Sequence, residues 1–445
     1  MRASEFLAEA ERLAEKMPPG RHFLNACAGR YRFAVGLAAG LMTGRVSLLP
    51  STHTPEVIRH LLQFAPDAFC LTDDDTCTIE LPRLRYSDAT FPVSTDGSQS
   101  GAVQVPDIRD DQLAAIVFTS GSTGTPLPYR KTWGRLARCV RAEAQELGIA
   151  DGSGFTLIGT VPPQHMYGFE STVLVALQSA NAFTSERAFF PADIVSALAA
   201  APRPRVLVTT PVHLRALLAA GLPWPGLDLI VSATAPLSRE VAHEAEIQSG
   251  AQLLEIYGST ETGQIAIRRT SESDTFRLIP GVKLRADNGQ TYAHGGHVEQ
   301  MTPMCDVIEL AGEREFTLHG RTADLVNVAG KRSSFGYLNA QLNAIPGVLD
   351  GAFFLRDSDH GGATGIARLA AAVVAPTLSA ASLLESLRQR IDPVFLPRPL
   401  CLVNRLPRNA TGKLPHQALE ALIEQHCSTP AAEPGTSKRS PHGKS

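Results

Sequence analysis

The chain has 445 residues, of which 44% are hydrophobic and 19% are charged, and its net charge is −3. This length exceeds the usual size of one domain, so we expect two or three domains with a substantial core. The nearly balanced charge argues against a general attraction to nucleic acid or to anionic membranes.

Cysteines and apolar runs indicate the compartment. The cysteines are odd in number and scattered, without a CxxC pair: Cys27, Cys70, Cys77, Cys139, Cys305, Cys401 and Cys427. This pattern argues against structural zinc or a disulfide framework, and it predicts free thiols in a reducing compartment. The longest wholly apolar run, 34–42, is far too short to cross a membrane. Residues 1–17 are typical of an amphipathic helix and not of a signal peptide, so we expect a cytoplasmic protein.

The first part of the chain alternates helix and strand. Helices are predicted over 32–42 and 54–64, with a strand over 45–50 between them. This alternation predicts a largely parallel sheet. Residues 71–110 are polar and rich in turn-forming residues, and a buried strand is expected at 114–118.

The same alternation continues downstream. A helix is expected over 133–147, and helices over 211–220 and 238–249 separate further strands, predicted at 155–160, 205–210, 227–232 and 252–257. Ligands of open α/β sheets bind beyond the carboxyl ends of the strands. Polar or small residues occupy four such ends: 119–126, 160–168, 232–236 and 257–263.

The last third of the chain has a different pattern. Short alternating segments over 275–320 predict antiparallel strands. Residues 320–425 predict a small α+β domain, with strands near 352–355 and 369–374 and a helix over 382–391. The last residues, 428–445, are rich in Pro, Ser, Gly and Lys, which predicts a disordered tail.

The most informative motif is Thr-Ser-Gly-Ser-Thr-Gly-Thr-Pro at 119–126, directly after a predicted strand. Its small residues would let backbone N–H groups and hydroxyls converge on phosphate oxygens. The alternative is a surface turn rich in Ser, Thr and Gly. The chain has neither G-x-x-x-x-G-K-[ST] nor G-x-S-x-G, so the motif belongs neither to a P-loop NTPase nor to a hydrolase elbow.

A second motif, Tyr257–Gly263, places Glu261 among hydroxyl groups at the end of a predicted strand. Such a carboxylate suits Mg²⁺ shared with substrate phosphates, although an acid at a helix start would show the same pattern. The third motif is Gly-Arg-Thr-Ala-Asp at 320–324, followed by Gly330-Lys331-Arg332, and its alternative is a charged connector. In the fourth, 407–414, Lys413 follows Gly412 on a turn, and the alternative is a solvated lysine.

These four motifs, in this order, resemble the adenylate-forming superfamily of acyl- and aryl-CoA synthetases, adenylation domains of peptide synthetases, and luciferase. The resemblance covers roughly residues 20–425. It implies an α/β fold with a large N-terminal domain of several sheets (1–319), a hinge (320–325) and a small mobile C-terminal α+β domain (326–427). It also implies two steps, in which ATP and a carboxylic acid give an acyl-adenylate and a thiol then forms the thioester.

The resemblance assigns roles to particular residues. Positions that would hold the β- and γ-phosphates are Thr119, Ser120, Gly121, Ser122, Thr123, Gly124 and Thr125. Positions that would surround the rest of the nucleotide are Ala233, Thr234, Ala235 and Pro236 at adenine, Tyr257, Gly258 and Ser259 beside them, Asp306 at the ribose with Arg321 as its neighbour, and Gly330. Glu261 would bind Mg²⁺, and Thr260 would contact the α-phosphate.

The mobile domain supplies the remaining roles. Asp324 matches the hinge residue, and Lys413 matches the lysine that bridges the acid and the α-phosphate. A cation at that place would lower the repulsion between two anions, and a mobile domain would withdraw it before the thiol enters. His165 matches the residue that gates the acid pocket.

The chain departs from the family pattern after the phosphate motif. Leu127 stands where relatives have lysine, and Lys131 is the nearest lysine, so Lys131 is a candidate for contacting the phosphates. Asn327 and His416 also replace common basic residues, and the N-terminal region is shorter than in most relatives.

The short form resembles the aryl:acyl-carrier-protein ligases of aryl-polyene and xanthomonadin-type pigment synthesis. That resemblance implies a hydroxybenzoate as the acid, in a pocket near His165, Tyr167, Phe169, Ala233 and Tyr257. The acceptor would be a phosphopantetheine thiol on an acyl carrier protein. One alternative is an aryl- or acyl-CoA synthetase that uses free CoA. The other is a non-catalytic nucleotide-binding protein, which the combination of Glu261, Asp306 and Lys413 argues against.

Overall fold

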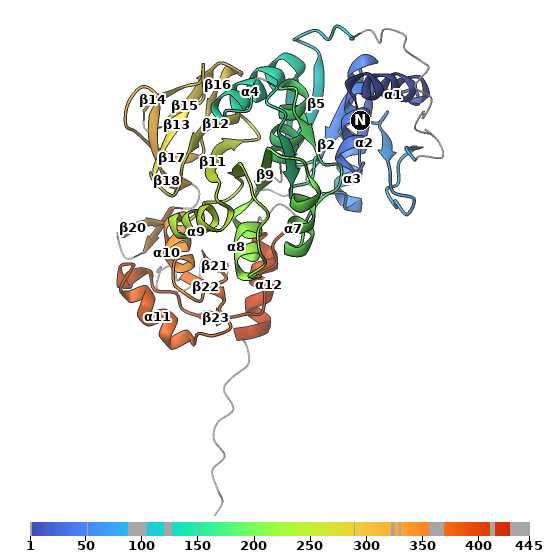
Figure 1. Ribbon diagram of the computed structural model, residues 1–445. Helices are drawn as coiled ribbons and strands as arrows, with labels where there is room; N and C mark the ends of the chain where they lie inside the picture. Colours follow the sequence, from blue (N-terminus) through green and yellow to red (C-terminus); the bar gives the residue numbers. More distant parts are fainter. Residues whose placement is uncertain are drawn as a thin grey trace, which may run out of the picture. The chain divides into compact units, whose positions relative to one another are not determined.

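The computed structural model describes residues 2–50, 52–87, 105–119, 127–150, 152–288, 290–321, 325–328, 331–355, 369–409 and 414–427. The chain divides into two compact units, with the break between Leu325 and Val326 (Figure 1). The predicted hinge residue Asp324 and the predicted tail, 428–445, lie outside the described residues. The hinge and the tail therefore stay predictions.

The first sheet of the larger unit, sheet A, has six strands among the residues described, in the spatial order β4-β3-β1-β2-β5-β6. All neighbours from β4 to β5 pair in parallel, and β6 returns antiparallel to β5. The strands are β1 (His22–Asn25), β2 (Val46–Leu49), β3 (Phe69–Thr72), β4 (Arg83–Arg85), β5 (Leu113–Thr119) and β6 (Leu127–Thr132). The predicted parallel sheet is confirmed, and β4 adds a short strand to a region expected to be irregular.

The second sheet, sheet B, repeats this plan. Its order within the described part of the chain is β17-β18-β13-β12-β11-β10-β9-β7-β8, parallel from β8 to β11 and antiparallel beyond. The strands are β7 (Thr156–Gly159), β8 (Ala182–Phe183), β9 (Arg205–Thr209), β10 (Leu229–Ser232), β11 (Gln252–Ser259), β12 (Gly263–Arg268), β13 (Thr275–Leu278), β17 (Asp306–Leu310) and β18 (Glu315–Arg321).

An antiparallel sheet C completes the larger unit. Its strands are β14 (Lys283–Asp287), β15 (Gln290–Gly295) and β16 (Val298–Pro303). The antiparallel strands predicted over 275–320 are confirmed.

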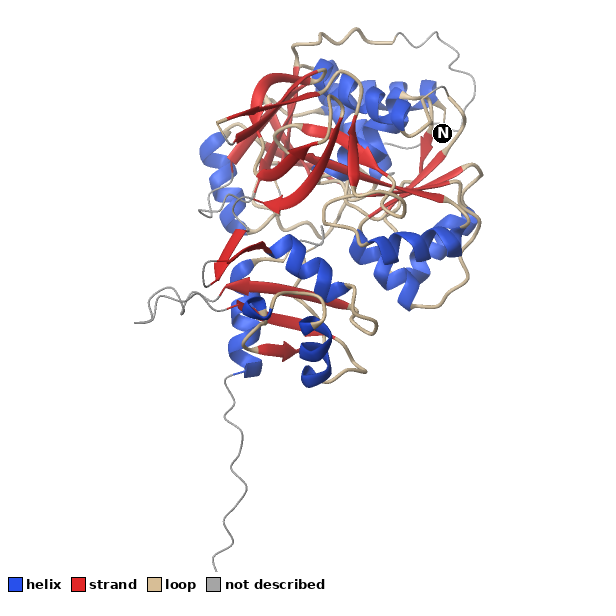
Figure 2. Ribbon diagram, turned by 90° about the vertical axis from the view of Figure 1, so that its left-hand side faces the viewer, coloured by secondary structure: helices blue, strands red, loops and turns tan. Residues whose placement is uncertain are grey.

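Neighbouring residues of a parallel strand enter different cores. In β9, Val206 and Val208 join the core that also contains Phe23 and Phe69 of sheet A. Leu207 between them packs in a second core with residues of α7, α8 and α9. This alternation follows from the two-residue period of a strand, and burial on both faces is typical of parallel sheets. The strands therefore lie between layers of helix (Figure 2).

The helices of the larger unit begin and end at local signals. They are α1 (Ala3–Lys16), α2 (Arg30–Met42), α3 (Pro55–Phe64), α4 (Trp133–Glu146), α5 (Met166–Gly168), α6 (Val175–Gln178), α7 (Pro191–Ala200), α8 (Pro211–Ala219) and α9 (Arg239–Ser249). A hydroxyl caps α8, where Thr210 Oγ1 accepts from the N–H of His213 at 3.4 Å. Gly250, with φ +70°, ends α9 in the left-handed conformation.

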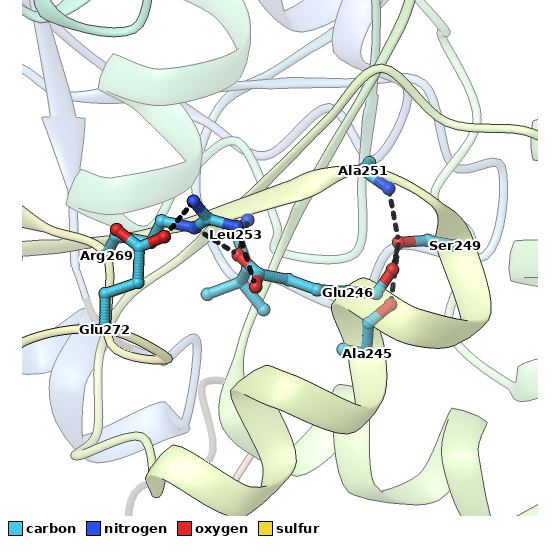
Figure 3. A network of polar contacts seen from close by, with 7 residues as sticks. All are labelled: Ala245, Glu246, Ser249, Ala251, Leu253, Arg269 and Glu272. Carbon is cyan, nitrogen blue, oxygen red and sulfur yellow. Dashed lines mark hydrogen bonds and ion pairs between the residues drawn. The ribbon is translucent and has the colours of Figure 1, made fainter.

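The end of α9 is tied to sheet B by a polar network (Figure 3). The Glu246 carboxylate accepts from the Leu253 N–H at 2.8 Å and from Arg269 Nε at 2.9 Å. Arg269 also contacts Glu272. Because Leu253 lies on β11 and Arg269 follows β12, the network holds both strands that lead to and from the Tyr257–Gly263 motif.

The smaller unit has its own cores. Its elements are β19 (Leu325–Val328), β20 (Lys331–Ser334), α10 (Phe335–Asn343), β21 (Asp350–Leu355), β22 (Leu369–Val374), α11 (Ala380–Arg388), β23 (Leu400–Leu402) and α12 (His416–Cys427). Among the residues described, β21, β22 and β23 form one sheet, with α10 and α11 packed on one face and α12 on the other. The predicted α+β character is confirmed.

The structure bears on two predictions about the whole chain, one on free cysteines and one on membrane-spanning helices. Cys401 is disulfide-bonded, so the prediction that all cysteines are free thiols is wrong for this residue. Cys27, Cys70, Cys77, Cys139 and Cys305 are free. In the part of the chain that the structure describes, no helix is long and apolar enough to cross a membrane.

Candidate active site

The Tyr257–Gly263 motif forms a β-hairpin. β11 ends at Ser259, β12 begins at Gly263, and these two residues pair across the turn. The Ser259 N–H donates to Thr262 Oγ1 at 3.2 Å, and the Thr262 N–H donates to Ser259 Oγ at 3.2 Å. Glu261 lies half-buried in this turn. The alternative interpretation of Glu261 as a helix-start acid is therefore wrong.

The glycines of the motif are required by close packing. A Cβ atom on Gly258 would lie 2.4 Å from the Gly263 carbonyl oxygen. Gly263 has φ +75°, and a Cβ there would lie 3.1 Å from Cys139 Sγ and 3.2 Å from Glu170 Oε1. A side chain at either glycine would displace the turn, and at Gly263 it would also strain the backbone.

Two cationic side chains donate hydrogen bonds to backbone carbonyl oxygens of the turn. Lys131 Nζ donates to the carbonyl oxygen of Thr260. Arg135, on α4, donates through Nη2 to the carbonyl oxygen of Glu261. Lys131 is only 1% exposed. The Lys131 ammonium therefore contacts protein backbone in this structure, and its predicted contact with phosphate stays a prediction.

A buried carboxylate accompanies these cations. Glu170 lies in the π-helical stretch Phe169–Leu174, which continues α5 into α6. Burial raises the pKa of Glu170, whereas the charges of Lys131 and Arg135 oppose that rise. Burial lowers the pKa of Lys131, Arg135 adds to the effect, and Glu170 opposes it. The two side chains thus stabilise each other's charged form.

The proposed adenine segment follows β10 and is held by a second buried carboxylate. Thr234 has φ +81°, an uncommon conformation for a β-branched residue. At the end of the segment the Leu237 N–H donates to Glu255 Oε1 at 3.1 Å. Glu255 also accepts from Arg268 Nε at 2.8 Å and from Thr270 Oγ1 at 2.6 Å. A constrained backbone of this kind is typical of a ligand-contacting loop.

Asp306 lies beside Tyr257. The Tyr257 hydroxyl donates to Asp306 Oδ2 at 2.5 Å, and Asp306 pairs with Arg321 across β17 and β18. The Tyr257 ring packs on Phe276 and Phe316, each with a centroid distance of 5.6 Å. The predicted neighbourhood of Asp306 and Arg321 is thus present in the strand register, and Tyr257 orients the carboxylate.

The residues expected to line the acid pocket are unequally exposed. His165 immediately precedes α5 and is half-buried. Tyr167 is 6% exposed, and its hydroxyl donates to the Val231 carbonyl at 3.0 Å. Phe169 is fully buried. Tyr167 therefore contacts β10 from within the core, and Phe169 packs edge-on against Phe33 of α2.

Several predicted site residues lie outside the described residues. They are Ser120, Gly121, Ser122, Thr123, Gly124, Thr125, Asp324, Gly330 and Lys413. Thr119 ends β5, so the predicted phosphate segment does begin at the carboxyl end of a parallel strand. The roles assigned to all these residues stay predictions.

Arg135 and Glu170 were not predicted from the sequence. Glu170 is the one acid within the largely apolar run 166–177, and a buried carboxylate is costly unless it is paired. Arg135 follows Lys131 by four residues across a strand–helix junction, where simple helical spacing does not apply. For Glu170, the usable signal in the sequence was a charged residue inside an apolar run.

Comparison with known proteins identifies the family. Residues 8–291 match the AMP-binding enzyme family. A 4-coumarate–CoA ligase of Rhodobacter capsulatus is 33% identical over 54% of this chain and 60% of its own length, so the chain matches less than two thirds of that relative. A 4-coumarate–CoA ligase of Halorhodospira halophila is 30% identical over 66% of this chain and 73% of its own length.

A solved structure shares the fold. O-succinylbenzoate coenzyme A synthetase of Bacillus subtilis, in complex with ATP and magnesium ion, superposes with a TM-score of 0.74 at 19% identity, covering 94% of this chain and 93% of the other. The expected architecture of a large α/β domain and a small C-terminal domain is confirmed. The fold is the one found in that acid–CoA synthetase. The chain belongs to the AMP-binding enzyme family.

Proposed function

We propose that this protein is an ATP-dependent ligase that adenylates a small aromatic carboxylic acid and transfers the acyl group to a phosphopantetheine thiol. The observation that carries the proposal is the β11–β12 turn. It holds Thr260 and Glu261 where a parallel strand ends, in a chain of the AMP-binding enzyme family. Substrate sites of open α/β sheets lie at such strand ends.

In the first step, a carboxylate oxygen of the acid attacks the α-phosphorus of ATP. A C–O–P linkage forms, and the bond from the α-phosphorus to pyrophosphate breaks. The hydroxyl of Thr260 would bind the α-phosphate, and Lys413 would lie between the two anions. Asp306, oriented by Tyr257, would accept hydrogen bonds from the ribose hydroxyls. Fixed donors placed where charge develops are the main source of such acceleration.

In the second step, the thiol sulfur attacks the acyl carbon and AMP leaves with the bridging oxygen. The thiol proton passes to solvent or a nearby base. His165, before α5, would open the acid pocket to the entering thiol. The residues 233–236, held through Glu255, would keep the nucleotide in place during both steps.

The turn also fits a magnesium ion. Glu261 supplies a half-buried carboxylate, and hard carboxylate oxygens together with substrate phosphates are the ligands that Mg²⁺ prefers. When bound, the ion would neutralise charge on the phosphate oxygens. The B. subtilis structure with the same fold contains ATP and magnesium ion.

The aromatic acid and the carrier protein are the finer part of the proposal. Both 4-coumarate–CoA ligases named above act on an aromatic acid, and the short form of the chain resembles the hydroxybenzoate-activating, carrier-loading ligases. Those relatives also favour a second candidate, in which the acceptor is free CoA.

The test is mass spectrometry of products after incubation with ATP, Mg²⁺ and 3- or 4-hydroxybenzoate, in the presence of either CoA or a phosphopantetheinylated carrier protein. We expect an acylated carrier protein with AMP and pyrophosphate as coproducts. Acylation of CoA alone would favour the second candidate. ATP binding without pyrophosphate release over a panel of acids would leave only a non-catalytic nucleotide-binding protein.

A further inference from the structure

Two segments of the proposed phosphate site come from different sheets. The strand β6 of sheet A begins at Leu127, directly after the phosphate segment, and Lys131 is its fifth residue. The Thr260–Thr262 turn belongs to sheet B. The Lys131 side chain crosses from the first sheet to the second and ends on the Thr260 carbonyl.

A second cation makes a parallel contact. Arg135 lies in the first turn of α4, the helix that follows β6, and it donates to the carbonyl of the next residue, Glu261. Two consecutive carbonyls of one turn are therefore each bound by a positively charged donor. Charge-assisted hydrogen bonds are stronger than neutral ones, so together they fix the orientation of both peptide groups.

We propose that Lys131 and Arg135 are positioning residues that hold the Thr260–Glu261 backbone at a fixed place relative to the strand leaving the phosphate segment. The inference rests on the proposed function, which gives Thr260 the α-phosphate and Glu261 the magnesium ion. Lys131 and Arg135 act on these groups through the backbone. Supporting groups of this kind orient the direct ligands of a metal.

The burial of Lys131 supports this role. A lysine is almost never fully buried unless it is paired, because its charge loses hydration. Here the Thr260 carbonyl accepts one hydrogen bond, and Glu170 supplies the counter-charge that opposes the loss of the lysine proton. Glu170 Oε1 lies 3.2 Å from the point where a Cβ on Gly263 would stand, so its carboxylate lies close to the turn.

The departure of the chain after the phosphate motif agrees with this role. Leu127, which follows the phosphate motif, is uncharged and 50% exposed. The Lys131 ammonium is bonded to the Thr260 carbonyl and is 1% exposed. The lysine of β6 thus links this strand of sheet A to the Thr260–Thr262 turn of sheet B.

The experiment compares Lys131→Met and Arg135→Met with Arg135→Lys, which keeps a charged donor. Lys283→Met is the matched control, because Lys283 is exposed on β14 of sheet C. Hydrogen–deuterium exchange is followed for peptides covering 255–266, with peptides over 205–232 as the internal reference. Pyrophosphate release is measured against Mg²⁺ and against the acid.

For both methionine variants we expect exchange at the turn to rise about tenfold, the effect of one charge-assisted hydrogen bond. The apparent constant for Mg²⁺ should rise about tenfold or more, and the KM for the acid should stay within about twofold of wild type. Arg135→Lys should recover most of the Mg²⁺ response, and Lys283→Met should match wild type.

The double variant Lys131→Met/Glu170→Gln removes both buried charges, and it replaces Lys131→Met in the experiment if that variant does not fold. Unchanged exchange at the turn, or a faster exchange spread equally over the reference peptides, would overturn the positioning role. If the wild-type protein releases no pyrophosphate with any acid, the proposed function fails, and exchange at the turn alone then decides the inference.

Discussion

Sheets A and B each contain a run of parallel strands that ends in an antiparallel hairpin, and the two hairpins differ in their connections. In each, neighbouring parallel strands are followed by a strand that turns back: β6 on β5 in sheet A, and β12 on β11 in sheet B. Both hairpins carry a predicted phosphate-site motif. In sheet A the connection is the seven-residue segment 120–126, whereas in sheet B it is the three-residue turn 260–262.

The difference lies in what each connection uses to contact a ligand. The segment of sheet A offers small residues, so its binding would rest on several backbone N–H groups and hydroxyls. The turn of sheet B offers one carboxylate, and Lys131 and Arg135 donate hydrogen bonds to its backbone carbonyls. We infer that many weak donors would hold the phosphates on the sheet A side, whereas on the sheet B side one carboxylate would act on them through the Mg²⁺ that it binds.

The largest expected effect separates the two connections directly. Glu261→Gln removes the one carboxylate of the sheet B turn, and we expect pyrophosphate release at limiting Mg²⁺ to fall by about 100-fold or more. Ser122→Ala removes one of several hydroxyls from the sheet A segment, and we expect a fall of less than about tenfold. Steady-state rates against Mg²⁺ measure both, with Glu80→Gln, exposed beyond β3, as the control. Equal losses in the two variants would contradict the distinction.

A fall in pH should destabilise the folded protein through a buried histidine in α8, a helix that packs on sheet B. Burial lowers the pKa of His213 to about 4, and Arg187 adds to the effect. The unfolded chain, with an ordinary histidine pKa, binds a proton between pH 6.5 and 4 that the folded protein does not bind. Stability should therefore fall as the pH falls through this range, by at most about 3 kcal/mol from this residue.

His213→Asn tests the acid prediction, because asparagine does not titrate and retains a group that bonds to Thr210, which lies 2.8 Å from His213 Nδ1. Denaturant unfolding at pH 7.5 and at pH 4.5 should show a smaller loss of stability on acidification in the variant. The same pH dependence in both proteins would assign acid sensitivity to other groups.

A smaller effect is expected from adding one methyl group beneath the turn. Gly263→Ala should cost about 2 kcal/mol, because alanine is strained at φ +75° and its Cβ would crowd Cys139 and Glu170. Gly44→Ala is the matched control, since Gly44 has φ +67° with no heavy atom within 4 Å of a Cβ. Its cost should be about 1 kcal/mol, from backbone strain alone. Thermal unfolding of both variants gives the comparison, and equal costs would show that the packing beneath the turn is loose.

The smallest effect is a gain on the sheet A side. Leu127→Lys adds a charge directly after the proposed phosphate segment, where the present side chain is half exposed. We expect the KM for ATP to fall by about two- to fivefold, the range of an exposed ionic contact. Leu127→Met is the control without charge. An unchanged KM would mean that this position does not reach the phosphates.

The sequence predicts the fold well where local signals and periodicity agree. The strand at 252–257 and the helix over 238–249 lie within two residues of their expected bounds, because buried apolar runs and a Ser cap define them. β4, with three residues in a polar region, has neither signal and was missed. The sequence left two interpretations of Glu261, a magnesium ligand and an acid at a helix start, because both place a carboxylate among hydroxyl groups.

The supporting residues of the site could not be predicted in the same way. The contact between Lys131 on β6 and the Thr260 carbonyl joins two sheets, and no sequence spacing predicts it. Glu170 is 39 positions from Lys131 in the sequence, and the packing of the stretch 169–178 against α4 brings it near enough to influence the pKa of Lys131. The residues of a motif can be recognised from their type and spacing. The residues that hold a motif in place can be recognised only from tertiary contacts.

The central claim is that an acyl-adenylate forms, and an isotope experiment tests it most directly. 4-Hydroxybenzoate labelled with ¹⁸O in its carboxylate is incubated with ATP, Mg²⁺ and the acceptor thiol, and the nucleotide products are analysed by mass spectrometry. Attack of the carboxylate on the α-phosphorus, followed by thiolysis at the acyl carbon, predicts one ¹⁸O atom in each AMP. Unlabelled AMP, or label in inorganic phosphate with ADP as the nucleotide product, would contradict the account.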